Sequence, residues 1–402
     1  MRISIKTLGC RLNQAESNKI AEKLASFGVE LAFSAKSEPD LCIINTCCIT
    51  EKAVTKSRLE INKIRNRHKS AKVLLCGCAQ ELKSEADFFV EEKDKISEFI
   101  YDSFLKNNKI VRQDTNKLFK RGRTRAFLKI QDGCNNFCSY CIIPYVRKKM
   151  LSVPFFQVLE EIRKKEELGF KEIILTGVNI GKYKNKDLDL TGLVKKILKE
   201  TSISRIRFGS INPDSVDDKF ISLFQNERVC PHLHLSLQSG SDSILKRMNR
   251  NYKTRDYLNI VRKIRRKYSD FNFTTDVIVG FPGETREEFE ETCNFVKKVG
   301  FSKVHIFKYS RREGTVADKM DKQLNVNIKK ERALKLRLID KDLEARFSEK
   351  MIGQRKEILF ENKRKEYFSG FTKNYFKVRL RSRENLKNKI KTLKISNNHL
   401  TI

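Results

Sequence analysis

Short apolar runs alternate with helix-forming stretches over most of the 402-residue chain, and this alternation limits the folds it can adopt. In the first hundred residues the apolar runs span 3–7, 41–45 and 72–76, and helical spacing spans 15–27 and 52–67. Strands that alternate with helices form parallel sheets, because each helix carries the chain back to the edge where the next strand begins. The pattern therefore predicts an α/β protein with an open parallel sheet at its N-terminus.

A second, longer alternation begins after a polar, basic connector at about 106–123. Its helical stretches include 155–168 and 256–268. Its six strand candidates span 127–131, 172–176, 205–210, 232–237, 273–279 and 303–309. Six such units predict a partial, open version of the eight-unit β/α barrel, whose functional residues lie at the carboxyl ends of the strands.

The last part of the chain loses this alternation. A long charged helix is predicted at 328–351, and the helical signal stops after Gly353. Four short strand candidates then follow, at 357–361, 366–370, 375–380 and 390–395. We therefore expect three domains, with bounds of 1–110, 120–350 and 351–402, the third of them a small β-barrel.

The cysteine count and the start of the chain favour an intracellular, cytoplasmic protein. There are 11 cysteines, an odd number, and no apolar run approaches the roughly 18 residues of a membrane helix. The chain opens on a strand-like segment in place of a secretory signal, so no membrane partner is expected. Structural disulfides are unexpected in that compartment, which leaves metal ligation or simple burial as the roles of the cysteines.

The charge balance indicates a polyanionic partner. The chain has 84 Lys and Arg against 50 Asp and Glu, a net charge of +34. The segment 351–402 holds 14 Lys and Arg but only 4 Asp and Glu, interleaved with several Tyr and Phe. Such a mixture suits contact with phosphates and stacking on bases. Two other interpretations remain open: an evenly spread compositional bias, and aromatic rings that fill the core of the small barrel.

Three cysteines lie close together in a C-x3-C-x2-C run of Cys134, Cys138 and Cys141. A zinc site would need a fourth ligand, and no further Cys or His lies nearby in the sequence. A redox pair would use Cys138 and Cys141 but leave Cys134 idle. Three thiolates can instead hold three irons of a 4Fe–4S cluster, which leaves the fourth iron open to a ligand from outside the protein. Tyr140 offers an aromatic face on which an adenine could stack.

A second triplet is scattered over about seventy residues. Cys10, Cys47 and Cys78 each follow a predicted strand by two or three residues, and the carboxyl ends of parallel strands share one edge of a sheet. The same three-ligand argument therefore predicts a second 4Fe–4S cluster with an open iron. Cys48 competes with Cys47, and spacing alone does not choose between them.

The other cysteines fit structural roles. Cys42 and Cys76 lie inside apolar runs, where they resemble small core residues. Cys230 and Cys293 are isolated in the sequence and are expected to be structural.

The segment 125–144 resembles the radical S-adenosylmethionine (SAM) enzymes, and specifically the methylthiotransferases. The segments 7–17, 45–47 and 77–78 match that family's three motifs for an auxiliary cluster. This resemblance selects Cys47 over Cys48 and Cys78 over Cys76. It implies that SAM binds the open iron of the Cys134, Cys138 and Cys141 cluster and is cleaved to a 5′-deoxyadenosyl radical. It also implies that the Cys10, Cys47 and Cys78 cluster holds the sulfur that becomes methylated.

Further segments of the barrel resemble the family's cofactor-binding motifs. The positions that the resemblance assigns to SAM binding are Tyr140, Gly177, Asn179, Ser210, Gln238 and Gly280. Gly280 could instead serve a tight turn. His232 and His234 alternate along a strand, so we expect one of them to face the core. The chain departs from the family's pattern at Lys148, Leu151, Asn212, Lys308 and Val316.

The C-terminal segment resembles the TRAM domain, which binds RNA in this family. The resemblance places RNA contacts at Lys373, Tyr375, Lys377 and Arg379. The 7–17 segment is most similar to the branch that converts N6-threonylcarbamoyladenosine at position 37 of tRNA, next to the anticodon, to its 2-methylthio derivative. That reaction needs an electron donor, such as flavodoxin or ferredoxin, and a sulfur donor.

Other functions remain open at this point. The family's other substrates are isopentenyladenosine in tRNA and an aspartate of a ribosomal protein. The second cluster could also serve only as an electron wire in a radical oxidoreductase. A protein of another class, a non-catalytic iron–sulfur RNA-binding protein, would share the same composition.

Overall fold

The computed structural model describes residues 1–32, 38–106 and 124–400, which form two compact units. The first unit comprises Met1–Arg121, Cys141–Lys149 and Ser310–Gly314. The second comprises Gly122–Tyr140, Met150–Tyr309 and Thr315–Ile402. Nearly all of the predicted connector at 106–123 lies outside the described residues. Among the described residues, no helix combines the length and the apolar character needed to cross a membrane.

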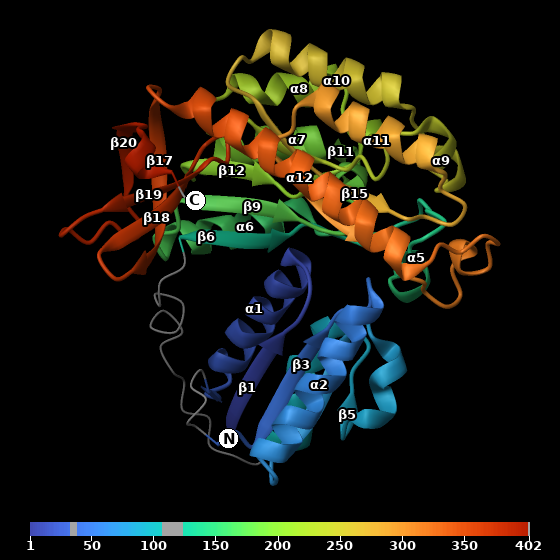
Figure 1. Ribbon diagram of the computed structural model, residues 1–402. Coiled ribbons are helices and arrows are strands. Elements are labelled where there is room, and N and C mark those ends of the chain that lie inside the picture. Colours follow the sequence, from blue (N-terminus) through green and yellow to red (C-terminus); the bar gives the residue numbers. More distant parts are fainter. Residues whose placement is uncertain (33–37, 107–123, 401–402) are drawn as a thin grey trace. The chain divides into compact units, whose positions relative to one another are not determined.

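The first unit is built on a five-stranded parallel sheet with the strand order β2-β1-β3-β4-β5 (Figure 1). The strands are β1 (Arg2–Thr7), β2 (Glu30–Leu31), β3 (Leu41–Thr46), β4 (Lys72–Gly77) and β5 (Phe88–Phe89). The helices α1 (Arg11–Ser26) and α2 (Glu51–Arg67) connect the first strands, and α3 (Ile96–Ile100) follows later. The predicted parallel sheet is confirmed, and the three predicted strands are found within one residue at each end.

The side chains of the buried strand β3 point alternately to the two faces of the sheet, and each face packs in its own apolar core. Leu41 and Ile43 pack on the side of α1 and α3, whereas Cys42 and Ile44 pack on the side of α2. Helix α1 begins at Arg11, four residues before the predicted start at 15. Residue 10, a cysteine, is its N-cap, so α1 begins directly after the turn that ends β1.

Six parallel strands form the open barrel of the second unit. They are β6 (Arg125–Lys129), β9 (Glu172–Thr176), β12 (Arg205–Phe208), β14 (His232–Leu235), β15 (Asn272–Val279) and β16 (Lys303–Lys308). The predicted strand at 205–210 is in fact two, because the chain changes neighbours at Gly209. Strand β12 pairs with β9, whereas β13 (Ser210–Ile211) pairs with β14. The Gly209 N–H donates to the carbonyl of Leu175 at the end of β9.

Helices cover the outside of this barrel (Figure 1). They include α6 (Phe155–Glu167), α7 (Leu190–Glu200), α10 (Thr254–Lys267), α11 (Arg286–Val299) and α12 (Val326–Met351). Residues such as Ile173, Ile206 and Leu233 face these helices in one continuous apolar core. The alternate residues of the same strands are often polar or charged, so the interior of the barrel is a polar surface.

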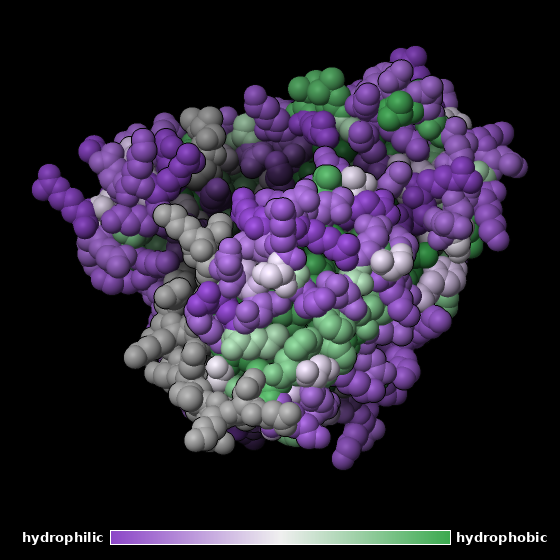
Figure 2. Space-filling view, turned by 90° about the horizontal axis from the view of Figure 1, so that it is seen from below, coloured by the Kyte–Doolittle hydropathy of each residue, from purple (hydrophilic) through white to green (hydrophobic). Residues whose placement is uncertain are grey.

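The end of the chain is a curled, four-stranded antiparallel sheet with the order β19-β18-β17-β20. Its strands are β17 (Arg355–Arg364), β18 (Tyr367–Thr372), β19 (Lys377–Arg381) and β20 (Ile390–Lys394). Phe360, Phe368 and Phe376 fill its own small core. Several of the aromatic residues of the basic tail therefore serve packing. Much of the molecular face drawn in Figure 2 is hydrophilic, as a chain with 33% charged residues requires.

Two fully buried arginines of β12 join the barrel to this C-terminal sheet. Arg205 donates to the Glu357 carboxylate at 2.9 Å and to the Phe371 carbonyl at 3.1 Å. Arg207 donates to both carboxylate oxygens of Glu172, at 2.7 and 3.1 Å, and to the Lys373 carbonyl at 3.0 Å. Burial alone would raise the pKa of Glu172, but Arg207 and its neighbours hold it below its usual value. Buried charges persist only with partners of this kind.

We therefore expect Arg207→Met to destabilise the protein by about 3 kcal/mol, because the buried Glu172 carboxylate loses its two hydrogen bonds and keeps only the longer ion pairs to Arg205, at 3.8 Å, and Arg125, at 4.0 Å. Urea unfolding followed by circular dichroism measures this loss. The control is Arg381→Met, whose partner Glu366 and own side chain are half or more exposed, so that its cost is about 0–1 kcal/mol. Equal losses in the two variants would contradict the structural role of the buried pair.

Candidate functional site

The cysteines of the scattered triplet follow the carboxyl ends of three adjacent strands. Residue pairs Thr7–Asn45 and Thr46–Gly77 are in register, so β1, β3 and β4 end at the same edge of the sheet. Cys10 is exposed, whereas Cys47 and Cys78 are buried. Burial raises the pKa of the Cys47 thiol to about 11, and the neighbouring Cys10 and Cys78 thiols act in the same direction. The structure thus brings the three predicted thiols together.

Close packing fixes the loops that carry these cysteines. Gly9 has a φ of +101°, and a Cβ at this position would lie 2.5 Å from the Cβ of Cys47. The buried Asn13 amide donates to the carbonyls of Leu8, at 2.8 Å, and Thr46, at 2.7 Å. One side chain of α1 therefore holds the backbone both before Cys10 and before Cys47.

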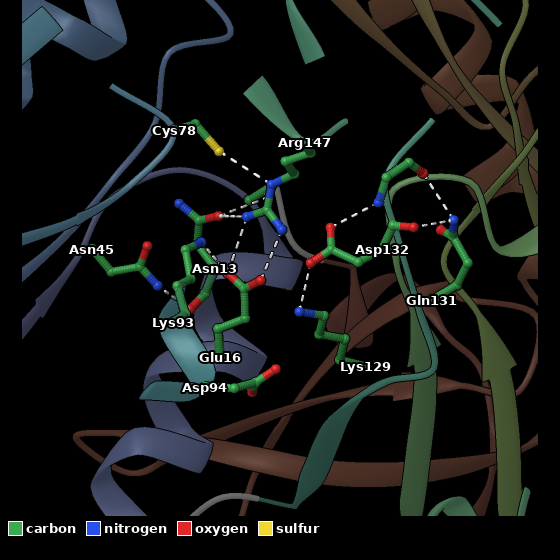
Figure 3. Close-up of polar contacts among 12 residues, drawn as sticks. Asn13, Glu16, Asn45, Cys78, Lys93, Asp94, Lys129, Gln131, Asp132 and Arg147 are labelled. Carbon is green, nitrogen blue, oxygen red and sulfur yellow. Dashed lines mark hydrogen bonds and ion pairs between the residues drawn. The ribbon is translucent and has the colours of Figure 1, made fainter. Parts of the chain in front are cut away.

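Arg147 supplies a charged hydrogen bond to this site. Its Nε donates to the Cys78 sulfur at 3.3 Å, and its Nη1 and Nη2 reach the Glu16 carboxylate at 2.8 and 3.1 Å (Figure 3). Lys93 forms an ion pair with the same carboxylate. A hydrogen bond from Cys48 lowers the pKa of Cys78; burial opposes it, and Arg147 and Lys93 reinforce it. These surroundings favour a thiolate at Cys78.

Cys48 takes part in the same contacts. It is the neighbour of Cys47 that spacing alone could not exclude as a cluster ligand. Its thiol lies against Cys78, and both this hydrogen bond and burial raise its pKa. Its side chain also packs in the apolar layer under α2. Glu16 lies in the 7–17 motif of the sequence analysis but was given no role of its own, and Arg147 and Lys93 were not predicted as parts of this site. The two basic residues carry no other sequence signal than their charge, because their partners are far away along the chain.

The second cysteine group lies in the loop after β7 (Gln131–Asp132), at the carboxyl end of the first barrel strand. Within the second unit, the Cys134 sulfur accepts from Asn179 Nδ2 at 3.9 Å and the Cys138 sulfur from Arg250 Nη1 at 3.3 Å. Cys141 falls in the segment that belongs to the first unit. The loop is braced at its start, since the Gly133 N–H donates to Asp132 Oδ1 at 2.8 Å (Figure 3).

Several residues predicted to bind SAM surround this loop at the strand ends. Asn179 is buried, and its N–H donates to Gln131 Oε1 at 2.7 Å. A Cβ on Gly177 would lie 2.6 Å from the Gln131 carbonyl oxygen, so close packing alone explains that glycine. Tyr140 packs beside the small apolar cluster of Met248 and Phe281.

The remaining residues predicted to bind SAM are Gln238, Gly280 and Ser210. Gln238, three residues after the end of β14, has a φ of +67°, which is uncommon for a residue with a side chain and marks a constrained position. Gly280 has a φ of +72°, and its N–H donates to Glu284 at 2.7 Å, so the tight-turn interpretation accounts for it as well. Ser210 is exposed in β13. Their roles toward SAM stay predictions.

We expected one of His232 and His234 to face the core, and the structure buries both side chains. Residues two apart on a strand share one face, and both side chains are buried and bonded to Thr274 Oγ1, at 3.0 and 2.9 Å. His234 also lies 3.1 Å from Asp276. Both histidines therefore have partners inside the barrel.

The four predicted RNA-binding residues lie in two different environments. Tyr375 is stacked against both Phe371 and His232, with ring centroids 4.7 and 4.6 Å away, and the Arg207 guanidinium lies 4.9 Å from its ring. Lys373 lies 3.5 Å from the Glu357 carboxylate. Lys377 and Arg379 are exposed on β19, where Arg379 lies over the Tyr367 ring.

The chemistry of these groups fits iron–sulfur ligation. Thiol sulfurs accept hydrogen bonds from guanidinium and amide donors, which suits a thiolate bound to a metal. In the described part of the chain, no three Cys, His, Asp or Glu side chains gather tightly enough to share one metal ion. A 4Fe–4S cluster does not need such an approach, because each thiolate binds a different iron.

An open parallel barrel with a three-cysteine loop after its first strand defines a radical SAM enzyme. Comparisons with known proteins agree: residues 128–296 match the Radical SAM superfamily, and residues 2–97 match the Uncharacterized protein family UPF0004. The radical S-adenosylmethionine methyltransferase TsrM from Kitasatospora setae shares the fold. Its TM-score is 0.57 at 13% identity, over 79% of this chain and 77% of that one.

Two curated relatives extend over almost the whole chain. The threonylcarbamoyladenosine tRNA methylthiotransferase MtaB of Thermotoga maritima is 38% identical over 393 residues, 93% of this chain and 90% of the relative. The tRNA-2-methylthio-N(6)-dimethylallyladenosine synthase of Acetivibrio thermocellus is 33% identical over 423 residues, 98% of this chain and 88% of the relative. The chain belongs to the radical SAM methylthiotransferase family. It is thus an enzyme, a transferase that uses SAM and a 4Fe–4S cluster.

The high pKa of Cys47 gives a test of the site in metal-free protein. Because a thiol with a pKa of about 11 is almost wholly protonated at pH 8, its alkylation by iodoacetamide should rise about tenfold from pH 8 to pH 9. Peptide mass spectrometry measures the rate. In the urea-unfolded chain Cys47 has an ordinary pKa near 8.5 and should show only about a threefold rise. Equal pH dependence in the folded and unfolded chains would contradict the buried environment.

Proposed function

We propose that this enzyme converts N6-threonylcarbamoyladenosine at position 37 of tRNA to its 2-methylthio derivative. The observation that carries the proposal is the pair of cysteine groups, each at the carboxyl ends of parallel strands. The Thermotoga relative, whose name gives this substrate, is 38% identical to the chain over 393 aligned residues, and the relative named for dimethylallyladenosine is 33% identical over 423. The MtaB of Bacillus subtilis is also 33% identical, over 422 residues, so the support for the threonylcarbamoyl substrate comes from the Thermotoga relative.

The proposal includes a second 4Fe–4S cluster held by Cys10, Cys47 and Cys78. The convergence of these thiols, the Arg147 donor and the buried Glu16 support it. In the proposed division of the chain, residues 1–110 form the domain of this cluster, 120–350 the radical SAM core and 351–402 a TRAM-like domain.

The reaction adds sulfur and a methyl group to an unactivated carbon. Bound SAM and the Cys134, Cys138 and Cys141 cluster supply the radical that such a carbon requires. The residues of the chain orient the cofactor and exclude water. Asn179 and Gln238 hold defined positions at the strand ends, and Tyr140 offers its ring to the adenine. The cluster of Cys10, Cys47 and Cys78 would hold the sulfur to be transferred.

The exposed face of the C-terminal sheet is proposed to bind the tRNA backbone. Lys377 and Arg379 are exposed there, and Tyr367 is partly exposed beneath Arg379. A guanidinium beside an aromatic ring suits phosphate contact together with base stacking. Tyr375 supports this face from within, because its ring is already stacked against His232 and Phe371.

The remaining partners follow from the chemistry. Reductive cleavage of SAM requires an electron donor such as flavodoxin or ferredoxin, and repeated turnover requires a sulfur donor. Both are available in the cytoplasm, where the tRNA substrate is also found.

Iron analysis tests the second cluster. After anaerobic reconstitution, the wild-type chain should bind about eight irons, two clusters' worth. The triple variant Cys10→Ala, Cys47→Ala, Cys78→Ala should bind about four and lose methylthio transfer. It should keep the cleavage of SAM to 5′-deoxyadenosine. The matched control is Cys42→Ala, a buried cysteine of β3, which should keep both clusters. Equal iron in the triple variant and the wild type would contradict the assignment.

Mass spectrometry of tRNA nucleosides tests the substrate. The reconstituted enzyme is incubated with SAM, reductant, sulfide and tRNA that carries either threonylcarbamoyladenosine or isopentenyladenosine. We expect the 2-methylthio product from the first tRNA at a rate at least tenfold above the second. A preference for isopentenyladenosine would overturn the choice of base. Modification of neither tRNA would direct the search to the ribosomal-protein aspartate, and no cleavage of SAM would favour the non-catalytic RNA-binding alternative.

A further inference from the structure

Three side chains of the second unit form a continuous chain of hydrogen bonds between Cys134 and Cys138. Asn179 follows β9, Asn212 follows β13, and Arg250 lies in the loop after α9 (Asp242–Arg247). Arg250 Nη2 donates to Asn212 Oδ1 at 2.8 Å, and Asn212 Nδ2 donates to Asn179 Oδ1 at 3.2 Å. The two ends of this chain donate to the two sulfurs, Asn179 to Cys134 at 3.9 Å and Arg250 to Cys138 at 3.3 Å.

The Arg250 guanidinium determines which atom donates and which accepts in each of these hydrogen bonds. Arg250 has only donors, so the oxygen of the Asn212 amide must face it. The amide nitrogen of Asn212 then faces Asn179 and requires the oxygen of that second amide. The nitrogen of Asn179 is thereby directed to the Cys134 sulfur. Only a side chain with one acceptor and one donor can serve at position 212, and a carboxylate there could not donate.

The surroundings hold this arrangement in place. Asn179 is 2% exposed, and its nitrogen also lies 3.4 Å from Asn136 Oδ1. Arg250 Nε also donates to the hydroxyl of the buried Tyr252 at 3.1 Å. Within the described residues, the hydrogen bonds of Arg250 go to an amide, a hydroxyl and the Cys138 sulfur, and Asp214 lines the same small hollow. Asn212 is also one of the positions where the sequence departs from its family's pattern.

We propose that Asn212 is a positioning residue that raises the reduction potential of the cluster by orienting both N–H donors toward its ligand sulfurs. Hydrogen bonds to the sulfurs stabilise the electron-rich, reduced form of an iron–sulfur cluster, and they are a recognised control of its potential. A higher potential makes the cluster easier for a given donor to reduce before SAM is cleaved. The inference rests on the proposed ligation of the cluster by Cys134 and Cys138.

Electron paramagnetic resonance during a redox titration of the reconstituted full-length chain tests this inference. The signal followed is that of the cluster whose spectrum changes on addition of SAM. Asn212→Asp keeps the acceptor but removes the donor, and Asn212→Ala removes both without adding charge. Each should shift the equilibrium toward the oxidised cluster by about tenfold, which corresponds to about 59 mV for one electron.

The control is Asn251→Asp, because Asn251 lines the same small hollow as Asn212 and Arg250 but lies outside the chain of hydrogen bonds. It adds the same charge nearby and should shift the equilibrium less than threefold. The inference is overturned if iron-loaded Asn212→Ala keeps the wild-type potential, or if Asn251→Asp shifts it as far as Asn212→Asp. A wild-type chain without iron would contradict the proposed function itself, so the two failures are distinguishable.

Discussion

Parallel strands end at one edge of their sheet, and both cysteine groups depend on this constraint. In the first unit, β1, β3 and β4 are paired in register up to their last residues, and the turns after them carry Cys10, Cys47 and Cys78. In the second, the loop with Cys134 and Cys138 follows the first barrel strand, and the residues that contact it follow β9 and β13. Backbone pairing thus brings cysteines that are far apart in the sequence to one edge of a sheet, and side chains such as Asn13 then hold the loops that carry them.

Buried charged residues of the second unit fix how its C-terminal sheet packs on the barrel. Arg205 and Arg207 are fully buried where the barrel meets the C-terminal sheet, and the Glu172 carboxylate balances them. Their remaining donors reach carbonyls of β18 and the turn after it, so the docking of this sheet is directional as well as apolar. Such a network fixes the orientation of Lys377 and Arg379 relative to the barrel, since the whole C-terminal sheet belongs to the same compact unit.

Much of the fold could be predicted from the sequence because its signals are local. Apolar runs of five or six residues located strands such as β9 and β3 within a residue. The break at Gly209 was missed, since a change of strand neighbour leaves no trace in an apolar run. The helix start at Arg11 was missed as well, because Cys10 is a weak N-cap signal and makes no side-chain capping bond.

The site was predicted less completely, for a physical reason. The cysteines, Asn179 and Gln238 belong to motifs and could be named from sequence, and Arg250 lies in the segment 248–250, which resembles a further motif of the family. The contacts of Arg147, Arg250 and Asn212 could not be predicted, because they join residues between 33 and 134 positions apart and no periodicity reports such pairs. Tyr375 shows the opposite case, because an aromatic residue in a basic segment fits RNA stacking and internal stacking equally well until its neighbours are known.

The two cysteine groups differ in how their arginines are balanced. Arg147 shares its charge with Glu16 while it donates to Cys78, and Lys93 pairs with the same carboxylate. Arg250 donates to Cys138 with amide and hydroxyl groups as its other hydrogen-bond partners. Arg147 and Lys93 share the single Glu16 carboxylate, so the charge beside Cys78 sums to one positive unit, as the Arg250 guanidinium does beside Cys138. On the proposed function, the two sites therefore differ in how the guanidinium is oriented toward the sulfur: a carboxylate holds Arg147, whereas the Asn212 amide holds Arg250.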